Sequence, residues 1–284
     1  MVKTIYELEP YKKLKRYLNK LITGNSHGLV IRSVGGTGKS YLVEKELQHN
    51  ASEYIIINSY VTPMELYNLI YQNRNITIVF DDTEDLLKDN KVIGMLKGAF
   101  QPSFMNKRMV SYHSSRLTEG LPSEFEFTGK IVILTNQNLA ENTSTKALLS
   151  RLMVYNLEVK YETFIQYMDW MANNVKYEHL SKDKRNECLD FIKNVTDETF
   201  PNFNLRKLTK VYECMVYDED DWRLPAIDEL TEGRDHPSNR KLQTIKKVVE
   251  LLESGKPVKE QITEFEKTGM HRSYYFKIKK GFEK

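Results

Sequence analysis

A glycine-rich segment near the amino-terminal end has the residue types that bind phosphate groups. Residues 33–40 read Ser-Val-Gly-Gly-Thr-Gly-Lys-Ser and end in the Gly-Lys-Ser of the phosphate-loop rule G-x-x-x-x-G-K-[ST]. Glycines let consecutive backbone N–H groups point at an anion, and a helix that begins here adds its dipole. The segment therefore predicts a site for ATP and Mg²⁺, formed by Gly35, Gly36, Thr37, Gly38, Lys39, Ser40 and Tyr41.

Within this loop, Lys39 would place a positive charge on the β- and γ-phosphates, and the Ser40 hydroxyl would bind Mg²⁺. Ser33 departs from the rule, which has glycine at its first position. The loop directly follows the apolar run Gly28-Leu-Val-Ile-Arg, and a strand at this place favours a phosphate loop over an ordinary glycine-rich turn.

Two further apolar runs end in polar side chains that suit ATP hydrolysis. Asp81 and Asp82 follow one run, and Asn136 follows the other. We expect Asp81 to hold Mg²⁺ through water and Asp82 to polarise the attacking water, a role for which Glu84 competes. The Asn136 amide would orient that water or contact the γ-phosphate, although an amide at such a place is also typical of a turn.

These side chains need a scaffold that brings the ends of separate runs together. Between residues 28 and about 160, short apolar runs alternate with helical patterns, which is typical of a parallel sheet flanked by helices. The first, third and fourth runs are continuously apolar, as expected for central strands. The predicted strands are 29–33, 54–58, 76–81, 130–136 and 154–160. The fold class is therefore α/β, a P-loop NTPase three-layer sandwich with a central five-stranded parallel sheet.

The connection between the third and fourth strands contains a predicted helix at 90–100 and then two alternating segments. These segments are 108–115 and 124–128, and a turn-rich tip separates them. Alternation of this kind predicts a β-hairpin inserted ahead of the fourth strand. Positive charge on the hairpin comes from Lys107, Arg108, His113 and Arg116.

The order of these motifs resembles the AAA+ ATPases over about residues 28–217. Three predicted helices at 161–175, 181–195 and 204–217 would be the family's helical lid. The resemblance implies that Asn136 is the sensor-1 residue. It also implies that Arg151 is the arginine finger that reaches a neighbouring subunit's nucleotide, and that Arg206 contacts the γ-phosphate as sensor 2. An ordinary solvated or salt-bridged side chain is the alternative for each arginine.

The hairpin resembles an insertion ahead of sensor 1 in one AAA+ branch, which includes the superfamily 3 helicases of viruses and plasmids. This resemblance implies that Lys107, Arg108 and Arg116 contact DNA in the channel of a homo-oligomeric ring, such as a hexamer, with Arg151 acting in trans. The family's acidic strand usually ends in Asp-Glu, whereas this one ends in Asp-Asp.

The carboxyl-terminal segment reads as a helix, a Thr268-Gly269 turn and a second helix rich in aromatic and basic side chains. This helix-turn-helix spacing resembles small phage and transposon-type modules whose second helix enters the major groove of DNA. Alternatively the aromatic side chains pack on the preceding helix, which we expect for Tyr274 and Phe276, and the lysines are solvated. The predicted contacts to bases and phosphates are His271, Arg272, Ser273, Tyr275, Lys277, Lys279 and Lys280.

Four regions follow from these patterns: a core ATPase domain at 1–160, a helical lid at 161–217, an acidic linker at 218–236 and a DNA-binding domain at 237–284. The net charge of +3 does not by itself indicate nucleic acid. Two cysteines give no disulfide framework, which fits a reducing cytoplasm, that of the host for a phage protein. No run of about 18 apolar residues predicts a membrane span.

The sequence therefore predicts an ATP-hydrolysing AAA+ motor or switch that acts on DNA in phage or mobile-element replication. Helicase, helicase loader and initiator all fit, with other replication proteins as partners. An ATP-switched DNA-binding regulator fits the same motifs. A P-loop kinase is a further alternative, although the Thr-Asn strand end, the helices after the sheet and the basic tail stand against it.

Overall fold

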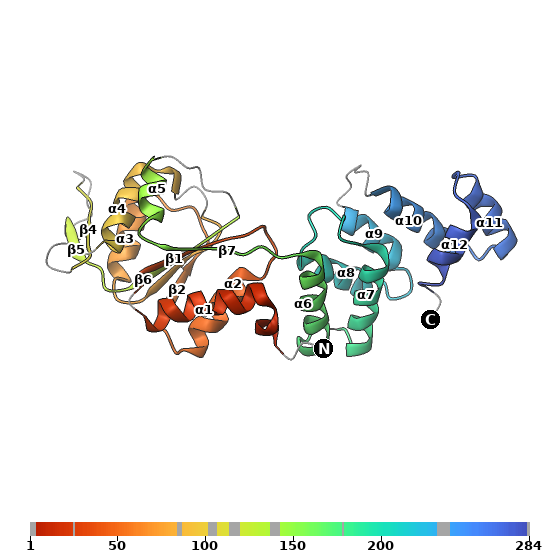
Figure 1. Cartoon of the computed structure of the whole chain (residues 1–284), viewed down its shortest axis with the longest axis horizontal. Coiled ribbons are helices and arrows are strands. Elements are labelled where there is room, and N and C mark those ends of the chain that lie inside the picture. Colours follow the sequence, from red (N-terminus) through yellow and green to blue (C-terminus); the bar gives the residue numbers. More distant parts are fainter. Residues whose placement is uncertain are drawn as a thin grey trace. The chain divides into compact units, whose positions relative to one another are not determined.

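The computed structural model describes residues 4–24, 26–83, 87–101, 107–113, 120–136, 143–177, 179–231 and 239–282. The chain divides into two compact units (Figure 1). The sheet unit comprises Tyr6–Glu158, and the helical unit comprises Val159–Lys284 together with Met1–Ile5.

Five strands form the central sheet of the sheet unit, in the order β2-β3-β6-β1-β7, and all neighbouring strands are parallel. The three inner strands are β3, β6 and β1, which are the three continuously apolar runs. The predicted fold class is thus confirmed. The strands are β1 (Gly28–Arg32), β2 (Tyr54–Ile57), β3 (Thr77–Phe80), β6 (Lys130–Thr135) and β7 (Met153–Asn156).

Helices cover both faces of this sheet. Figure 1 shows α1 and α2 on one face and α3, α4 and α5 on the other, which makes three layers. Thr62 caps α3 by accepting a hydrogen bond from the Glu65 N–H at 3.3 Å, and Pro63 occupies the first helical position, where no backbone donor is needed. The helices are α1 (Glu9–Thr23), α2 (Lys39–His49), α3 (Pro63–Gln72), α4 (Asn90–Phe100) and α5 (Thr143–Leu149), with a short 3₁₀-helix at Ile5–Glu7.

The inserted hairpin consists of β4 (Met109–Ser111) and β5 (Glu124–Glu126), which pair antiparallel. Both strands are shorter than predicted, and residues 114–119 of the tip lie outside the described residues. Val110 and Phe125 are opposite each other and buried. The Phe125 ring lies 5.2 Å from the Tyr67 ring, so the base of the hairpin belongs to the core of the sheet unit.

The helical unit contains α6 (Tyr161–Asn174), α7 (Lys182–Val195), α8 (Arg206–Tyr217), α9 (Arg223–Thr231), α10 (Asn239–Glu253), α11 (Val258–Glu266) and α12 (Arg272–Lys279). The first three are the predicted lid helices. No described helix in either unit is long and apolar enough to cross a membrane. Both cysteines, Cys188 and Cys214, are free thiols.

The predicted acidic linker at 218–236 is wrong for much of its length, because α9 occupies the middle of it. Trp222, Ala226, Ile227 and Leu230 are buried, and α9 packs against α8 and α10. The apolar residues of α9 recur at helical spacing and face its neighbours, whereas Asp228 and Glu229 of the same helix are exposed. We therefore find one compact unit where two regions and a linker were predicted.

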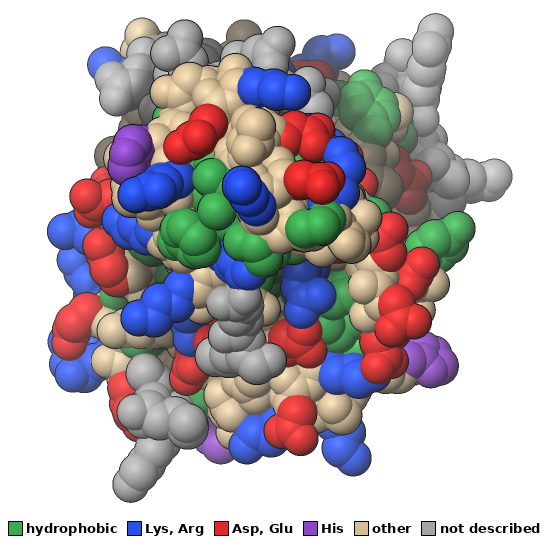
Figure 2. Space-filling model, turned by 90° about the vertical axis from the view of Figure 1, so that its right-hand side faces the viewer, with side chains coloured by type: hydrophobic (Ala, Val, Ile, Leu, Met, Phe, Trp, Pro, Cys, Tyr) green, Lys and Arg blue, Asp and Glu red, His purple; other side chains and the backbone are tan. Residues whose placement is uncertain are grey.

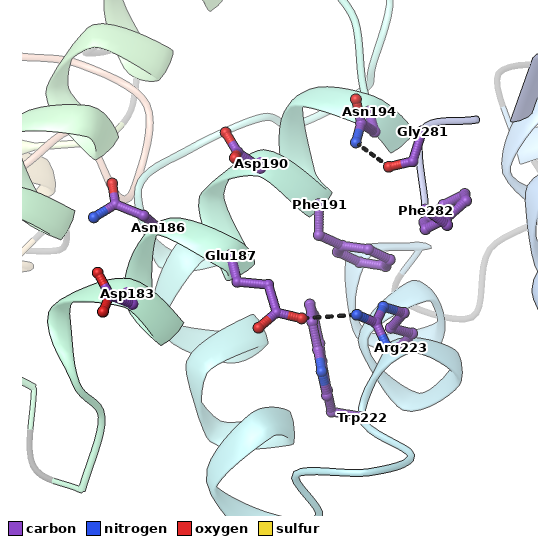
Figure 3. Close-up of a pocket in the computed structure, with 10 residues that line it drawn as sticks. All are labelled: Asp183, Asn186, Glu187, Asp190, Phe191, Asn194, Trp222, Arg223, Gly281 and Phe282. Atoms are coloured by element: carbon purple, nitrogen blue, oxygen red, sulfur yellow. Dashed lines mark hydrogen bonds and ion pairs between the residues drawn. The ribbon is translucent and has the colours of Figure 1, made fainter. Parts of the chain in front are cut away.

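The end of the described chain returns to α7. The Phe282 ring lies 6.0 Å from the Phe191 ring, and the Asn194 side chain donates a hydrogen bond to the Gly281 carbonyl at 3.0 Å (Figure 3). An open cavity of about 420 Å³ lies beside these residues. On its other side Arg223 stacks over Trp222. None of the residues predicted to bind nucleotide or DNA lines this cavity.

Candidate functional site

The topology of the sheet places the predicted nucleotide residues at one edge. The phosphate loop follows β1, Asn136 follows β6, and Asp81 follows β3, and these are the three adjacent inner strands. Because the strands are parallel, their carboxyl ends lie side by side, where ligands of open α/β sheets bind.

Two glycines give the phosphate loop its shape. Gly36 and Gly38 have φ angles of 73° and 82°, a region that a side chain at Cβ disfavours. Gly38 directly precedes α2, so the first N–H groups of that helix, which have no partner inside the helix, face the space at the end of the loop. The local geometry is that of an anion site.

Lys39 connects the three strand ends. Its side chain is 5% exposed, and its Nζ donates a hydrogen bond to the Asn136 Oδ1. The Asn136 Nδ2 in turn donates to the Asp82 Oδ1 at 2.8 Å. The structure thus brings together three side chains that the sequence placed after three different strands.

Asp81 offers an oxygen that suits a hard cation. Its Oδ1 is buried and has no hydrogen-bond partner among the described residues. A buried carboxylate oxygen without a partner is costly, and a metal ion would satisfy it. No group of three or more His, Cys, Asp or Glu side chains gathers as a metal site in the described part of the chain. Ser40 and Asp81 fit Mg²⁺, which binds through one or two protein oxygens and the nucleotide's phosphates.

Asp82 has an unusual backbone conformation. Its φ angle is 51°, in the left-handed region that aspartate tolerates better than most side chains. Such residues gather at functional sites, because the surrounding structure must hold them there. Glu84, the competing candidate for polarising water, lies outside the described residues.

Tyr41, also predicted at the nucleotide site, is 48% exposed on the first turn of α2. The Lys45 Nζ lies 5.6 Å from the centre of its ring, one helical turn away. Its role toward the nucleotide stays a prediction.

The two predicted arginines lie in different units. Arg151, just after α5, donates from Nε to the Gln101 Oε1 at 2.7 Å and from Nη1 to the Ala147 carbonyl. Arg206 is the first residue of α8 in the helical unit. Its backbone N–H donates to the Asn204 Oδ1 at 3.0 Å, while its side chain is exposed. The finger and sensor roles stay predictions.

Arg108 was predicted to contact DNA, and the structure contradicts this. Its side chain is 8% exposed. Nη1 donates to the Ala99 carbonyl at 3.0 Å, and Nη2 donates to the Gly129 carbonyl at 2.9 Å. The guanidinium lies 5.2 Å from the Phe127 ring, and burial lowers its pKa. Arg108 therefore anchors the hairpin to α4 and to Gly129, the residue directly before β6.

The other basic residues of the hairpin have a different environment. The Lys107 side chain is 54% exposed and lies 3.1 Å from a Glu126 carboxylate oxygen. His113 is exposed. Arg116 lies outside the described residues. Lys107 and Arg116 thus remain the candidates for DNA contact on this hairpin.

Tyr275 is a second correction. It is fully buried between α11 and α12, its hydroxyl donates to the Gln261 Oε1, and its ring lies 5.6 Å from the Phe265 ring. Phe276, which we expected in the core, is 46% exposed. His271 caps α12 by accepting a hydrogen bond from the Ser273 N–H.

The remaining predicted DNA residues of α12 lie toward solvent. Arg272, Ser273, Lys277 and Lys280 are exposed, and Lys279 is half-buried. The face in Figure 2 carries lysine and arginine side chains interspersed with acidic and apolar ones. The charge on this face is therefore mixed, not a single basic patch.

Three polar contacts at the site were not foreseen from the sequence. Tyr11 of α1 donates a hydrogen bond to the Thr37 carbonyl in the phosphate loop, and the Ser33 hydroxyl forms a hydrogen bond with the Thr37 hydroxyl. The Gln101 side chain accepts a hydrogen bond from Arg151. The only signal was the departure at Ser33, since the partners of the other two lie far away in sequence.

Comparisons with known proteins agree on the fold. No family model matches the sequence. A mutant of RuvB from Thermotoga maritima aligns with a TM-score of 0.54 and 12% identity, over 96% of this chain and 87% of RuvB. The Thermotoga maritima RuvB Holliday junction branch migration motor aligns with a TM-score of 0.53 and 14% identity, over 94% and 86%. At these identities the likeness concerns the fold, and the chain has the α/β fold of the AAA+ P-loop ATPases.

A relative by sequence comes from Enterobacteria phage T4. It is an uncharacterized 36.7 kDa protein in the nrdC-mobD intergenic region. It is 28% identical over an alignment of 244 residues, and the match covers 75% of this chain and 74% of that protein.

Proposed function

We propose that this chain is an ATP-hydrolysing AAA+ enzyme that acts on DNA in phage replication. The hydrogen-bond chain from Lys39 through Asn136 to Asp82 carries the proposal. It joins the phosphate-binding lysine to the two side chains predicted to orient and polarise water, and the buried Asp81 oxygen belongs to the residue directly before Asp82.

This arrangement supports the following proposed role for each residue. Lys39 exchanges Asn136 for the β- and γ-phosphates when ATP is bound, and the loop N–H groups hold the phosphate oxygens. Ser40 and Asp81 would hold Mg²⁺, and the ion would supply positive charge against the phosphates. Asn136, released from Lys39, orients the attacking water, and Asp82 accepts its proton.

Action on DNA is supported by the basic side chains and by the comparisons. Lys107 on the hairpin and Arg272, Lys277 and Lys280 on α12 are exposed cations that can neutralise phosphates. RuvB, a branch migration motor at Holliday junctions, has the same fold. The phage T4 relative supports a place in phage biology and thus the host cytoplasm.

The site is completed, in our proposal, by a second copy of the chain. Arg151 is exposed beside Gln101, and as an arginine finger it would reach the γ-phosphate of a neighbouring subunit in a ring. Arg206 would contact the γ-phosphate from the helical unit. Both arginines act on charge that grows in the transition state, so their loss lowers the hydrolysis rate more than nucleotide affinity.

Phosphate release at several protein concentrations, with and without DNA, tests this proposal. We expect hydrolysis to rise with protein concentration and with DNA, and Lys39→Ala to abolish it. Mixing Lys39→Ala with Arg151→Ala should restore activity, because each variant supplies what the other lacks. Hydrolysis that responds to neither DNA nor protein concentration would refute the motor, and transfer of phosphate to a small acceptor would indicate a kinase.

A DNA motor and an ATP-switched regulator differ in what ATP hydrolysis does to the bound DNA. A motor separates strands or moves along them, whereas a regulator binds a duplex sequence under ATP control and does neither. Strand-displacement and footprinting assays on the same preparation distinguish the two. Replacing Lys277 and Lys280 by alanine should lower the slope of log affinity against log salt by about two, if both neutralise phosphates.

A further inference from the structure

Thr37 is held from two sides in the middle of the phosphate loop. Its side chain is fully buried, and its Oγ1 lies 2.9 Å from the Ser33 Oγ at the start of the loop. Its carbonyl accepts a hydrogen bond at 3.0 Å from the hydroxyl of Tyr11, which is fully buried on α1. The loop is thus braced by a helix that precedes it in sequence.

The bond to the carbonyl fixes the direction of a phosphate-binding N–H. The peptide between Thr37 and Gly38 is planar and trans, so its C=O and N–H point in opposite directions. Gly38 has a φ angle of 82° and no side chain that would restrict the rotation of this peptide. Tyr11 holds the carbonyl on the α1 side, and the Gly38 N–H therefore points to the opposite side, toward the phosphate space.

The helix that carries Tyr11 is itself fixed to the sheet. Tyr155 of β7 donates to the Pro10 carbonyl at 2.6 Å. At the other end of α1, the Lys130 Nζ of β6 donates to the Ile22 carbonyl at 2.7 Å. The Tyr11 hydroxyl is therefore held at a set position before any nucleotide binds.

We infer that Tyr11 is a positioning residue for nucleotide phosphates and that the Ser33 hydroxyl assists it by holding Thr37 across the loop. This inference rests on the proposed nucleotide site. It also explains why serine replaces glycine at the first loop position, since glycine cannot bond to the Thr37 hydroxyl. Tyr11 touches no phosphate; it acts through the Thr37–Gly38 peptide.

The test compares Tyr11→Phe with a matched variant elsewhere in the sheet unit. Tyr67 is also fully buried, and its hydroxyl also donates to a backbone carbonyl, that of Pro122 at 2.7 Å. Both phenylalanine variants lose one hydrogen bond of the same kind, so their melting temperatures should fall alike. The probes are Mg-ADP and inorganic tripolyphosphate, the second of which has no base or ribose.

We expect Tyr11→Phe to weaken the binding of both probes by roughly fivefold, about the value of one hydrogen bond, with Tyr67→Phe binding as the wild type does. Ser33→Ala should weaken both probes in the same direction, and Ser33→Thr, which keeps the hydroxyl, should restore binding. Calorimetry measures the affinities.

Two results would overturn the inference. One leaves the proposed nucleotide site intact, and the other overturns that site as well. If the wild type binds both probes and Tyr11→Phe binds them equally well, Tyr11 has only a structural role and the proposed ATPase stands. If the wild type binds neither probe, the proposed nucleotide site fails, and the positioning role fails with it.

Discussion

Replacing Arg108 by methionine tests whether this residue anchors the hairpin or contacts DNA. Methionine is unbranched and has no donor, so it fills the space of the arginine's aliphatic stem and removes both hydrogen bonds. The Ala99 and Gly129 carbonyls then each lose the hydrogen bond from Arg108. Because Arg108 is only 8% exposed, water has little access to replace these bonds. Anchoring predicts a large loss of stability, whereas DNA contact predicts almost none.

The magnitude follows from the number and kind of the bonds. A hydrogen bond from a charged donor contributes about 1.5–3 kcal/mol, so two bonds give about 3–6 kcal/mol. Burial of the guanidinium opposes this, because desolvation lowers the Arg108 pKa and is relieved in the variant. We expect a net loss of about 2–3 kcal/mol in the free energy of unfolding, or about 5–10 °C in the melting temperature of the sheet unit.

Urea unfolding followed by circular dichroism measures the loss, with two further variants for comparison. Lys107→Met removes a neighbouring charge whose side chain is 54% exposed, and it should change stability by less than about 0.5 kcal/mol. Arg108→Lys keeps the charge without the planar fork, so it should be nearly as unstable as Arg108→Met. If Arg108→Met unfolds like the wild type but loses DNA affinity, the anchoring argument is refuted.

Three other changes test separate parts of the molecule. Asn136→Ala should lower ATP hydrolysis on the order of a hundredfold while Mg-ADP affinity changes little, which phosphate release and calorimetry would show. The pKa of Glu253 is raised from 4.5 to about 7, first by desolvation and then by the carboxylate of Asp221, with Glu250 adding to it and Arg223 opposing it; the residue is exposed, so solvent screens much of this effect. The folded state therefore keeps this carboxyl protonated to a higher pH than the unfolded state does, and the free energy of unfolding should fall as pH rises from about 4.5 through about 7. In Glu253→Gln, this fall should be smaller by about 1 kcal/mol, which urea unfolding at several pH values measures. Tyr275→Phe loses one buried hydrogen bond and should destabilise the helical unit by about 1 kcal/mol, measured by urea unfolding. A tenfold loss of DNA affinity at unchanged stability would instead show that Tyr275 contacts DNA.

The inner strands were predictable because a short, continuously apolar run that ends in polar residues is typical of a buried central strand. β3 and β6 each contain a continuous apolar run followed by polar residues, so their type follows from the sequence, and their predicted bounds are correct to within one residue. The edge strand β7 ends at Asn156, although its alternating pattern continues to 160. It can pair only as far as β1 extends, and the last bond is from the Leu157 N–H to the Arg32 carbonyl at 2.7 Å. The length of an edge strand depends on its neighbour, which the local pattern does not contain.

The nucleotide residues were predictable for a similar reason, since each lies at the end of a strand and parallel strands end at one edge. Tyr11 was not, because a contact between a helix and a loop 26 residues later depends on how α1 packs on the sheet. Arg108 could have been interpreted better. Alternation places it on the same side of β4 as Val110, which is buried, so the pattern that predicted the hairpin already put Arg108 on the core side.

The second helix of the carboxyl-terminal pair shows why charge and aromatic content alone cannot assign a binding face. Three aromatic residues in a row, 274–276, fit any rotation of an eight-residue helix, so periodicity does not choose among them. In the structure, Tyr275 is the aromatic residue that packs against Phe265 of α11 in the buried cluster. The opposite side then holds Ser273, Phe276, Lys277 and Lys280, at helical spacing, and all four are exposed. A DNA contact by α12 would use this side together with the exposed Arg272, and here an exposed aromatic ring lies between cations.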